Sequence, residues 1–275
     1  MTSPIRVGAV SYLNAKPLYY RLKEASRGIE LAMDLPSRLA DRLAAGELDV
    51  ALIPSVEYLR GASRGYTIIP DIAIAARRAV RSVKLFCRTP IDRIDRLALD
   101  DGSRTSQALA RVWLKDKHGV APSTIEIHPM GVPVQESLAD AILLIGDRAM
   151  KVPDDGFDCV IDMAEAWIDL TGLPFVFAVW AARPGVDLGD LPEVLARRRD
   201  EGIADAFEIA RTYGPRLGLD VDLCYQYLTV SLSYDLGERE IAGLTEFARR
   251  AANLGLAPEG AKLVFHRGRD FAQSR

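Results

Sequence analysis

The stretch Val7-Gly-Ala-Val-Ser-Tyr-Leu-Asn-Ala-Lys-Pro-Leu18 decides how the chain begins to fold. Its apolar start, within Ile5–Val10, predicts a buried strand. Pro17 suits the first turn of a helix over residues 18–24, because proline lacks the backbone N–H that would have no partner there. The polar loop between them follows the carboxyl end of the strand, where α/β proteins bind ligands. An alternative is that Asn14 only caps the helix. The residues predicted at the mouth of a site are Ser11, Asn14 and Lys16.

Further strands and helices alternate after this stretch. The expected strands span residues 29–34 and 48–53, and the expected helices span residues 38–45 and 56–60. Such a β-α-β-α-β-α run predicts a parallel sheet with helices on its faces.

A second set of elements occupies the middle of the chain, and the last third is mostly helical. The expected strands there are 82–87, 97–99, 125–128 and 141–145, and the expected helices are 105–117, 163–171, 191–201, 203–213 and 238–254. Two extended stretches, 78–88 and 175–183, flank the middle section and are predicted to cross between two lobes. The predicted fold class is α/β, two-lobed with two interlobe crossings. Lobe 1 comprises residues 1–82 and 180–275, completed by the C-terminal helices, lobe 2 comprises residues 83–179, and the site lies in the cleft between them.

Composition excludes several classes of partner. The chain has 275 residues and a net charge of −3, which gives no electrostatic footprint for nucleic acid. No apolar run reaches the roughly 18 residues of a membrane span, and no secretory signal precedes the first strand, so no membrane partner and a cytoplasmic location are expected. The cysteines are expected to be isolated, reduced and buried, and the histidines have no metal-ligand spacing, so no metal is expected. These residues are Cys87, Cys159, Cys224, His118, His128 and His266. The oligomeric state stays open.

The strongest chemical motif is Ser103-Arg104-Thr105-Ser106, at the junction of a strand and a helix. A helix N-terminus offers free backbone N–H groups and a positive dipole end, which suit a carboxylate or phosphate. The hydroxyls and the arginine add donors, and Gly102 allows close approach of the backbone. The alternative is an ordinary Ser/Thr cap beside a surface arginine.

Pro54-Ser55 and Gly146-Asp147 also follow apolar strands directly, and each is a weaker candidate for a ligand contact or a helix cap. Ser82 would face the cleft if the chain has two lobes. No Ser-His-Asp or Cys-His arrangement and no phosphate-binding loop is present. The residues alone therefore predict a two-lobed α/β protein that binds a small anion.

Several segments, in order and over nearly the full length, resemble the chorismate dehydratases of the futalosine route to menaquinone. They are residues 7–18, 103–106, 141–147, 171–180 and 227–237. The resemblance implies the fold of type II periplasmic binding proteins. It also implies a hydro-lyase that converts chorismate to 3-[(1-carboxyvinyl)oxy]benzoate and water, with no metal or organic cofactor. Family loops usually carry a smaller residue in place of Lys16 and alanine in place of Arg148, which leaves the roles of these two side chains open.

The chemistry of this substrate suggests roles for the candidate residues. We expect the hydroxyls of the Ser103–Ser106 motif, with nearby backbone N–H groups, to bind a substrate carboxylate, and Asn14 to orient the reacting ring. Ser55 and Ser82 would hold the remaining polar groups, and Arg104 would face the ligand or brace the loop. The predicted catalytic residue is Asn14, and the predicted substrate-binding residues are Ser11, Ser55, Ser82, Ser103, Arg104, Thr105, Ser106, Gly146 and Asp147.

The general base has three candidates. An amide cannot accept a proton near neutral pH, which excludes Asn14. Asp147, Glu57 and the enolpyruvyl carboxylate of the substrate itself remain, and the last is favoured because no acidic residue stands inside the strongest motifs.

Two rival functions use the same fold. A non-catalytic anion-binding protein would be expected to carry an export signal, and a transcription-factor sensor domain would follow a helix-turn-helix segment. Among enzymes, the alternative is the related 1,4-dihydroxy-6-naphthoate synthase of the same pathway. The Ser103–Ser106 and Tyr12–Leu18 segments favour the dehydratase.

Overall fold

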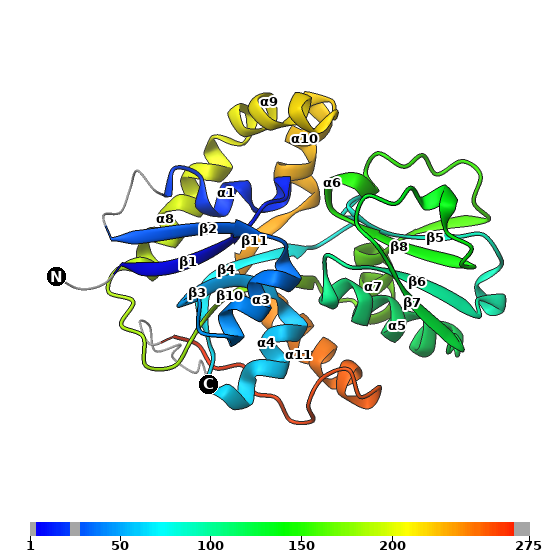
Figure 1. Ribbon diagram of the computed structural model, residues 1–275, viewed down its shortest axis with the longest axis horizontal. Coiled ribbons are helices and arrows are strands. Elements are labelled where there is room, and N and C mark those ends of the chain that lie inside the picture. Colours follow the sequence, from blue (N-terminus) through cyan, green and yellow to red (C-terminus); the bar gives the residue numbers. More distant parts are fainter. Residues whose placement is uncertain (1–3, 23–27, 267–275) are drawn as a thin grey trace.

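The structure, a computed structural model, describes residues 4–22 and 28–266. Two mixed sheets lie side by side, each covered by helices, as the left and right halves of Figure 1 show. The predicted two-lobed α/β class is confirmed. The first helix differs from the one expected over residues 18–24. A single 3-10 turn, Leu13–Ala15, leads into the short α1, Lys16–Tyr19. Residues 23 and 24 lie outside the described part.

The first sheet has the strand order β11-β4-β10-β3-β1-β2. Its strands are β1 Ile5–Val10, β2 Ile29–Asp34, β3 Val50–Pro54, β4 Thr67–Ala76, β10 Phe175–Ala182 and β11 Ser233–Leu236. The three strands β1, β2 and β3 are parallel, as predicted, whereas β10, β4 and β11 join through antiparallel pairing. The parallel arrangement predicted from the first three strands and their helices is therefore confirmed, and the other three strands extend the sheet by antiparallel pairing.

The second sheet has the order β7-β6-β8-β5-β9. Its strands are β5 Val83–Cys87, β6 Arg96–Asp100, β7 Thr124–His128, β8 Ala141–Ile145 and β9 Cys159–Asp162. Parallel pairing joins β6 to β7 and β8, and antiparallel pairing joins β5 to β8 and β9. Cys87 lies opposite Cys159 across β5 and β9, so these two thiols are neighbours and not isolated, although all three cysteines are free.

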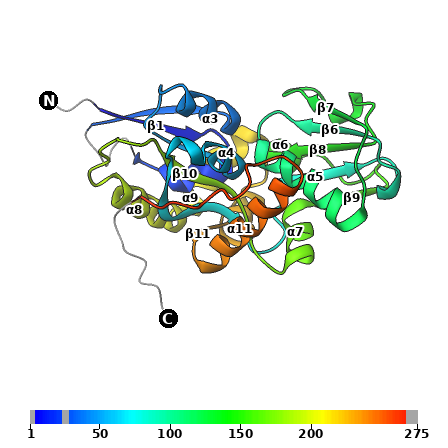
Figure 2. The same ribbon diagram turned by 90° about the horizontal axis from the view of Figure 1, so that it is seen from below.

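Helices cover both sheets and lie between them. They are α3 Pro36–Ala44, α4 Ser55–Gly61, α5 Arg104–His118, α6 Gly146–Ala149, α7 Met163–Thr171, α8 Leu191–Ala204, α9 Ala206–Leu217, α10 Val221–Gln226 and α11 Glu238–Asn253, with a π-helical turn at Tyr227–Ser231. The C-terminal helix α11 packs against β10 and β11, and α8 packs against β4 (Figure 2). In the described ranges no helix is both long and apolar enough to cross a membrane.

The chain passes from the first sheet to the second through residues 77–82. Asp162, at the end of β9, accepts hydrogen bonds from the backbone N–H groups of Val80 at 3.0 Å and Arg81 at 2.6 Å, and so fixes this segment. The predicted return crossing through residues 175–183 is wrong, because β10 is a fully buried strand inside the first sheet. The return occurs before it, in the residues between α7 and β10. The limits at 82/83 and 179/180 stay a prediction, and β10 extends on both sides of the second limit.

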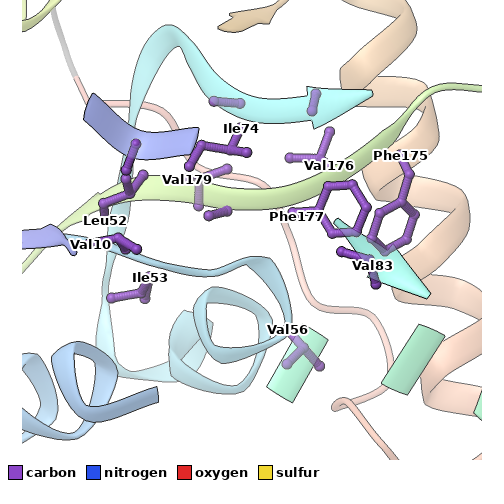
Figure 3. Close-up of a cluster of buried hydrophobic side chains, with 14 of the residues drawn as sticks. Val10, Leu52, Ile53, Val56, Ile74, Val83, Phe175, Val176, Phe177 and Val179 are labelled. Carbon is purple, nitrogen blue, oxygen red and sulfur yellow. The ribbon is translucent and has the colours of Figure 1, made fainter. Parts of the chain in front are cut away.

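One hydrophobic core continues from the first sheet into the second. Figure 3 shows Phe175 and Phe177 of β10 beside Val83, the first residue of β5. The same buried cluster includes Leu97 and Leu99 of β6. Because the two sheets share this core, the loops at their facing ends are held close to one another.

Candidate active site

A cavity lies between the two sheets, where β1, β3 and β8 end and α5 begins. The polar side chains that line it are those of Tyr12, Asn14, Ser82, Ser103 and Ser106. The remaining wall is mostly apolar and includes Val10, Ile74, Val80, Phe177 and Leu232. A few polar groups set in an apolar wall are typical of sites that bind and orient a small molecule.

Asn14 projects into this cavity from the 3-10 turn that follows β1. Its Oδ1 atom is buried and has no hydrogen-bond partner among the described residues. Its side chain forms no cap at the 3-10 turn or at α1, so the capping alternative is wrong. A buried acceptor without a partner is costly, so this atom is a candidate acceptor for a donor group of a ligand.

The first turn of α5 supplies two hydroxyls to the opposite wall. Ser103 is the N-cap: its Oγ accepts a hydrogen bond from the backbone N–H of Ser106 at 3.4 Å and one from the Ser106 hydroxyl at 3.2 Å. The cap interpretation is therefore correct, and both hydroxyls also line the cavity. The positive end of a fifteen-residue helix consequently faces the cavity, which favours an anionic group there.

Asp100 fixes the two loops that carry this wall, and sequence reasoning did not identify it. Its fully buried carboxylate accepts hydrogen bonds from the backbone N–H groups of Gly102 at 2.8 Å and Ile145 at 2.9 Å. The guanidinium of Arg148 donates to the same carboxylate through Nε, at 3.0 Å, and Nη2. Burial raises the pKa of Asp100, and the charge of Arg148 opposes that rise. Arg148 thus braces the loops and does not line the cavity.

Ser82 lies on the segment between the sheets, is fully buried and lines the cavity. Its Oγ accepts a hydrogen bond of 2.7 Å from the hydroxyl of Tyr227, on the π-helical turn. Burial raises the pKa of Tyr227, and the neighbouring side chains of Ser82 and Asn14 oppose that rise. Tyr227 therefore stays protonated and joins Ser82 to Asn14, a role that its sequence position did not indicate.

Ser55 and Thr105 lie behind the cavity wall and do not line it. The Ser55 hydroxyl donates to the carbonyl oxygen of Val176 at 2.8 Å, and Thr105 Oγ1 accepts from the backbone N–H of Val56 at 3.0 Å. The two hydroxyl oxygens are 3.3 Å apart. The hydrogen bonds of Ser55 and Thr105 therefore link α4 to β10 and α5 to α4.

Comparison with known proteins adds the family. A family model described as menaquinone biosynthesis matches residues 5–253. A chorismate dehydratase of Thermus thermophilus is 33% identical over an alignment of 272 positions, which covers 93% of this chain and 97% of that protein. A chorismate dehydratase of Campylobacter jejuni is 26% identical and covers 91% of this chain and 99% of its own.

The chain belongs to the menaquinone biosynthesis family. Solved structures support the fold of this family member. A protein from Archaeoglobus fulgidus superposes with a TM-score of 0.72 at 21% identity, covering 92% of this chain and 98% of its own. The periplasmic aliphatic sulphonate binding protein of Escherichia coli gives a TM-score of 0.63 at 12% identity, covering 98% and 96%. The periplasmic-binding-protein-like fold is therefore confirmed.

Two further candidates of this family member are Lys16, at the start of α1, and Asp147, on α6, which faces the 3-10 turn that precedes α1. Asp147 accepts the backbone N–H of Leu13 through both carboxylate oxygens, at 3.2 and 3.4 Å. Burial raises the pKa of Asp147, whereas the Leu13 hydrogen bond and the charges of Lys151 and Lys16 lower it. Burial lowers the pKa of Lys16, whose ammonium lies 4.5 Å from the ring centre of Tyr213. Neither side chain lines the cavity.

Three other candidates also lie outside the cavity wall. Arg104 forms a bidentate ion pair with Asp41, with both distances at 2.8 Å, and lies 3.4 Å from Glu57. Glu57 is also paired with Arg60 at 2.5 Å. Ser11 is exposed, and its backbone N–H bonds to the carbonyl oxygen of Asp34.

Gly146, in contrast, lines the cavity through its backbone. No group of three His, Cys, Asp or Glu side chains within residues 4–22 and 28–266 is arranged to hold a metal ion.

Proposed function

We propose that this chain is a chorismate dehydratase that acts in menaquinone biosynthesis. Two relatives with that name match more than nine-tenths of the chain. The composition of the cavity wall supports the proposal most directly. The amide of Asn14 and the hydroxyl of Ser82 lie in the same cavity as the hydroxyls at the N-terminus of α5. Such a wall suits a compact molecule with carboxylate groups.

The proposed reaction forms 3-[(1-carboxyvinyl)oxy]benzoate and water. The ring C–H bond beside the enolpyruvyl ether breaks, and its electron pair enters the ring and is conjugated with the ring carboxylate. The neighbouring C–O bond then breaks, hydroxide leaves, and the ring becomes aromatic. The proton and the hydroxide together make the water. The protein must therefore hold two carboxylates and stabilise charge that develops on one of them.

Each wall has a proposed task in this reaction. The N-terminus of α5, with Ser103 and Ser106, binds a substrate carboxylate through its hydroxyls and free backbone N–H groups. Asn14 hydrogen-bonds the reacting ring system on the opposite side, and Ser82, held by Tyr227, contacts the remaining polar group. The backbone of Gly146 borders the same space. Ser55, Thr105 and Arg104 support these walls from behind.

We infer that the enolpyruvyl carboxylate of the substrate removes the proton. The cavity-lining residues include no Asp, Glu, His or Lys. Glu57 is neutralised by two arginines outside the cavity, and both oxygens of Asp147 face the backbone of Leu13. The protein then contributes position and electrostatic stabilisation, which are sufficient for large rate gains.

The test is turnover by the purified protein. Chorismate is incubated with the protein without added metal, and its loss and the formation of the aromatic product are followed by chromatography and ultraviolet absorbance. The expected result is that the molar amount of chorismate lost equals the molar amount of aromatic product formed. Tight binding of chorismate without product would instead favour the anion-binding alternative.

A further inference from the structure

The loop that carries Asn14 is held from the other sheet by two separate contacts. Tyr12 packs against the loops that follow β6 and β8, and Leu13 bonds to α6. The backbone N–H of Ala15 donates to the carbonyl oxygen of Tyr12, at 3.3 Å, which closes the turn around Asn14. Asn14 itself has no hydrogen bond at Oδ1 to fix its amide. Apart from the contact of its side chain with Tyr227, its orientation depends on its neighbours in the turn.

The first contact is a notch formed by two glycines. A Cβ atom at Gly102 would lie 2.6 Å from the Tyr12 hydroxyl oxygen, and one at Gly146 would lie 3.2 Å from the Tyr12 ring. Gly146 also has a φ of +67°, which favours glycine. Only residues without a side chain leave room here, so the Tyr12 ring is seated between the two loops of the second sheet.

The second contact is the Asp147 carboxylate on the Leu13 N–H. Asp147 is 9% exposed, and its side chain reaches the first sheet from α6. Burial raises the pKa of Asp147, whereas the Leu13 N–H, Lys151 and Lys16 favour its charged form, which is the stronger acceptor. The bond fixes the residue that directly precedes Asn14.

We propose that Tyr12 and Asp147 form an interlobe clasp that positions Asn14 over the cavity. The clasp is the Tyr12 ring in the Gly102–Gly146 notch together with the Leu13–Asp147 hydrogen bond. Asp147 is then a positioning residue, and its carboxylate exchanges no proton with the substrate. The inference rests on the proposed function, since it names how the catalytic amide of that site is aligned.

Two variants of Asp147 separate positioning from base catalysis. Asp147→Asn keeps an oxygen that accepts the Leu13 N–H but cannot take up a proton, whereas Asp147→Ala loses the bond. A clasp predicts that kcat falls about 30-fold in the alanine variant and less than about 5-fold in the asparagine variant, with KM changed less than about 3-fold in both. Equal large losses in both variants would make Asp147 the base and overturn the proposal, as would an unchanged kcat in Asp147→Ala.

A double variant tests whether Asp147 acts through Asn14. In an Asn14→Ala background, Asp147→Ala should lower kcat less than about 3-fold further, because the group that it positions is gone. An additional loss as large as in the wild-type background would contradict the clasp. The matched control is Asp140→Ala, which removes a carboxylate that accepts the backbone N–H groups of Asp95 and Arg96 at the far end of β6. This control should leave kcat within about 2-fold of the wild type.

Hydrogen exchange gives a readout that does not need turnover. Backbone amides of residues 11–15 should exchange about 10-fold faster in Asp147→Ala and in Tyr12→Ala than in the wild type, and near the wild-type rate in Asp147→Asn and Tyr12→Phe. If the wild-type protein fails to convert chorismate, the proposed function fails while this measurement still tests the clasp. Unchanged exchange in both alanine variants would overturn the clasp, whatever the activity.

Discussion

At the scale of single residues, the polar side chains of the cavity differ in whether they have a hydrogen-bond partner within the protein. Ser82, Ser103 and Ser106 each have a protein partner, whereas the Oδ1 atom of Asn14 has none among the described residues. An acceptor that is buried and unbonded without ligand gains a full hydrogen bond when a ligand donates to it. Asn14 is therefore the residue whose truncation should matter most.

Asn14→Ala should lower kcat for chorismate by roughly 100-fold, because a preorganised hydrogen bond that strengthens in the transition state is worth about that factor. The free energy of unfolding should fall by no more than about 1 kcal/mol, since Oδ1 has no partner among the described residues and the side-chain contact that is lost is the one with Tyr227. Steady-state kinetics and thermal unfolding check the two parts. A variant that turns over within 5-fold of the wild type would contradict the assigned role.

Arg148→Ala should destabilise the fold by about 3 kcal/mol, because it leaves the fully buried Asp100 carboxylate without its counter-charge. Urea unfolding measures this free energy. Arg96→Ala, which removes an exposed partner 3.3 Å from Glu126, is the control and should cost less than about 1 kcal/mol. Equal losses in the two variants would show that Arg148 does not brace the loops.

The site residues that follow a strand closely could be predicted from the sequence. Those whose role comes from a hydrogen-bond partner far away in the chain could not. Asn14 and Ser103 follow strands directly, so their place at the mouth of the cavity was predicted from local order alone. The role of Asp100 was not predicted, because it depends on an ion pair with Arg148, which is 48 residues away. Tyr227 lies 145 residues from Ser82. No local pattern carries such information.

At the scale of elements, strand pairing was the part that local pattern did not determine. The eight residues of β10 are apolar on both faces, which fits a central buried strand as well as a connection between lobes. Only its pairing with β3 and β4 decides between them. β4 was not predicted because Pro70 and Asp71 interrupt its apolar pattern. The strand accommodates them through irregular register and a φ of +63° at Asp71.

The ion pairs that Glu246 makes within α11 should weaken in acid. Hydrogen bonds from Arg249, opposed by burial and reinforced by Arg250, lower the pKa of Glu246 to about 2, and Arg250 also pairs with Asp116 of α5 at 2.6 Å. Because the folded-state pKa lies below the ordinary value of 4.5, the stabilisation is complete above pH 4.5 and is lost as the pH falls towards 2.

Glu246→Gln should therefore lower the free energy of unfolding by about 1 kcal/mol at pH 7, and the difference from the wild type should shrink steadily between pH 4.5 and pH 3. Urea titrations at several pH values measure it. A difference that is constant with pH would assign the effect to packing and not to charge.

At the scale of the whole molecule, the cavity exists because segments from both sheets meet there. The loop after β1 comes from the first sheet, and the loops after β6 and β8 come from the second. Thr105 and Asp147 each bond a backbone N–H group across this junction, at Val56 and Leu13. A ligand between the sheets therefore adds contacts to both at once, and its binding energy also holds them together.

Chorismate should accordingly protect segments of both sheets together. At about 100 times its dissociation constant, it should add roughly 2.7 kcal/mol to the free energy of unfolding. Backbone amides in residues 11–15, 80–83, 102–106 and 145–147 should exchange more slowly with solvent. Those of residues 259–263, which line a separate groove beside α11, should not change. Because turnover consumes the substrate, the measurement uses the wild-type protein with the aromatic product, 3-[(1-carboxyvinyl)oxy]benzoate, in place of chorismate. Protection confined to one sheet would mean that the ligand binds at one wall, and the arrangement of substrate between Asn14 and the N-terminus of α5 would then be wrong.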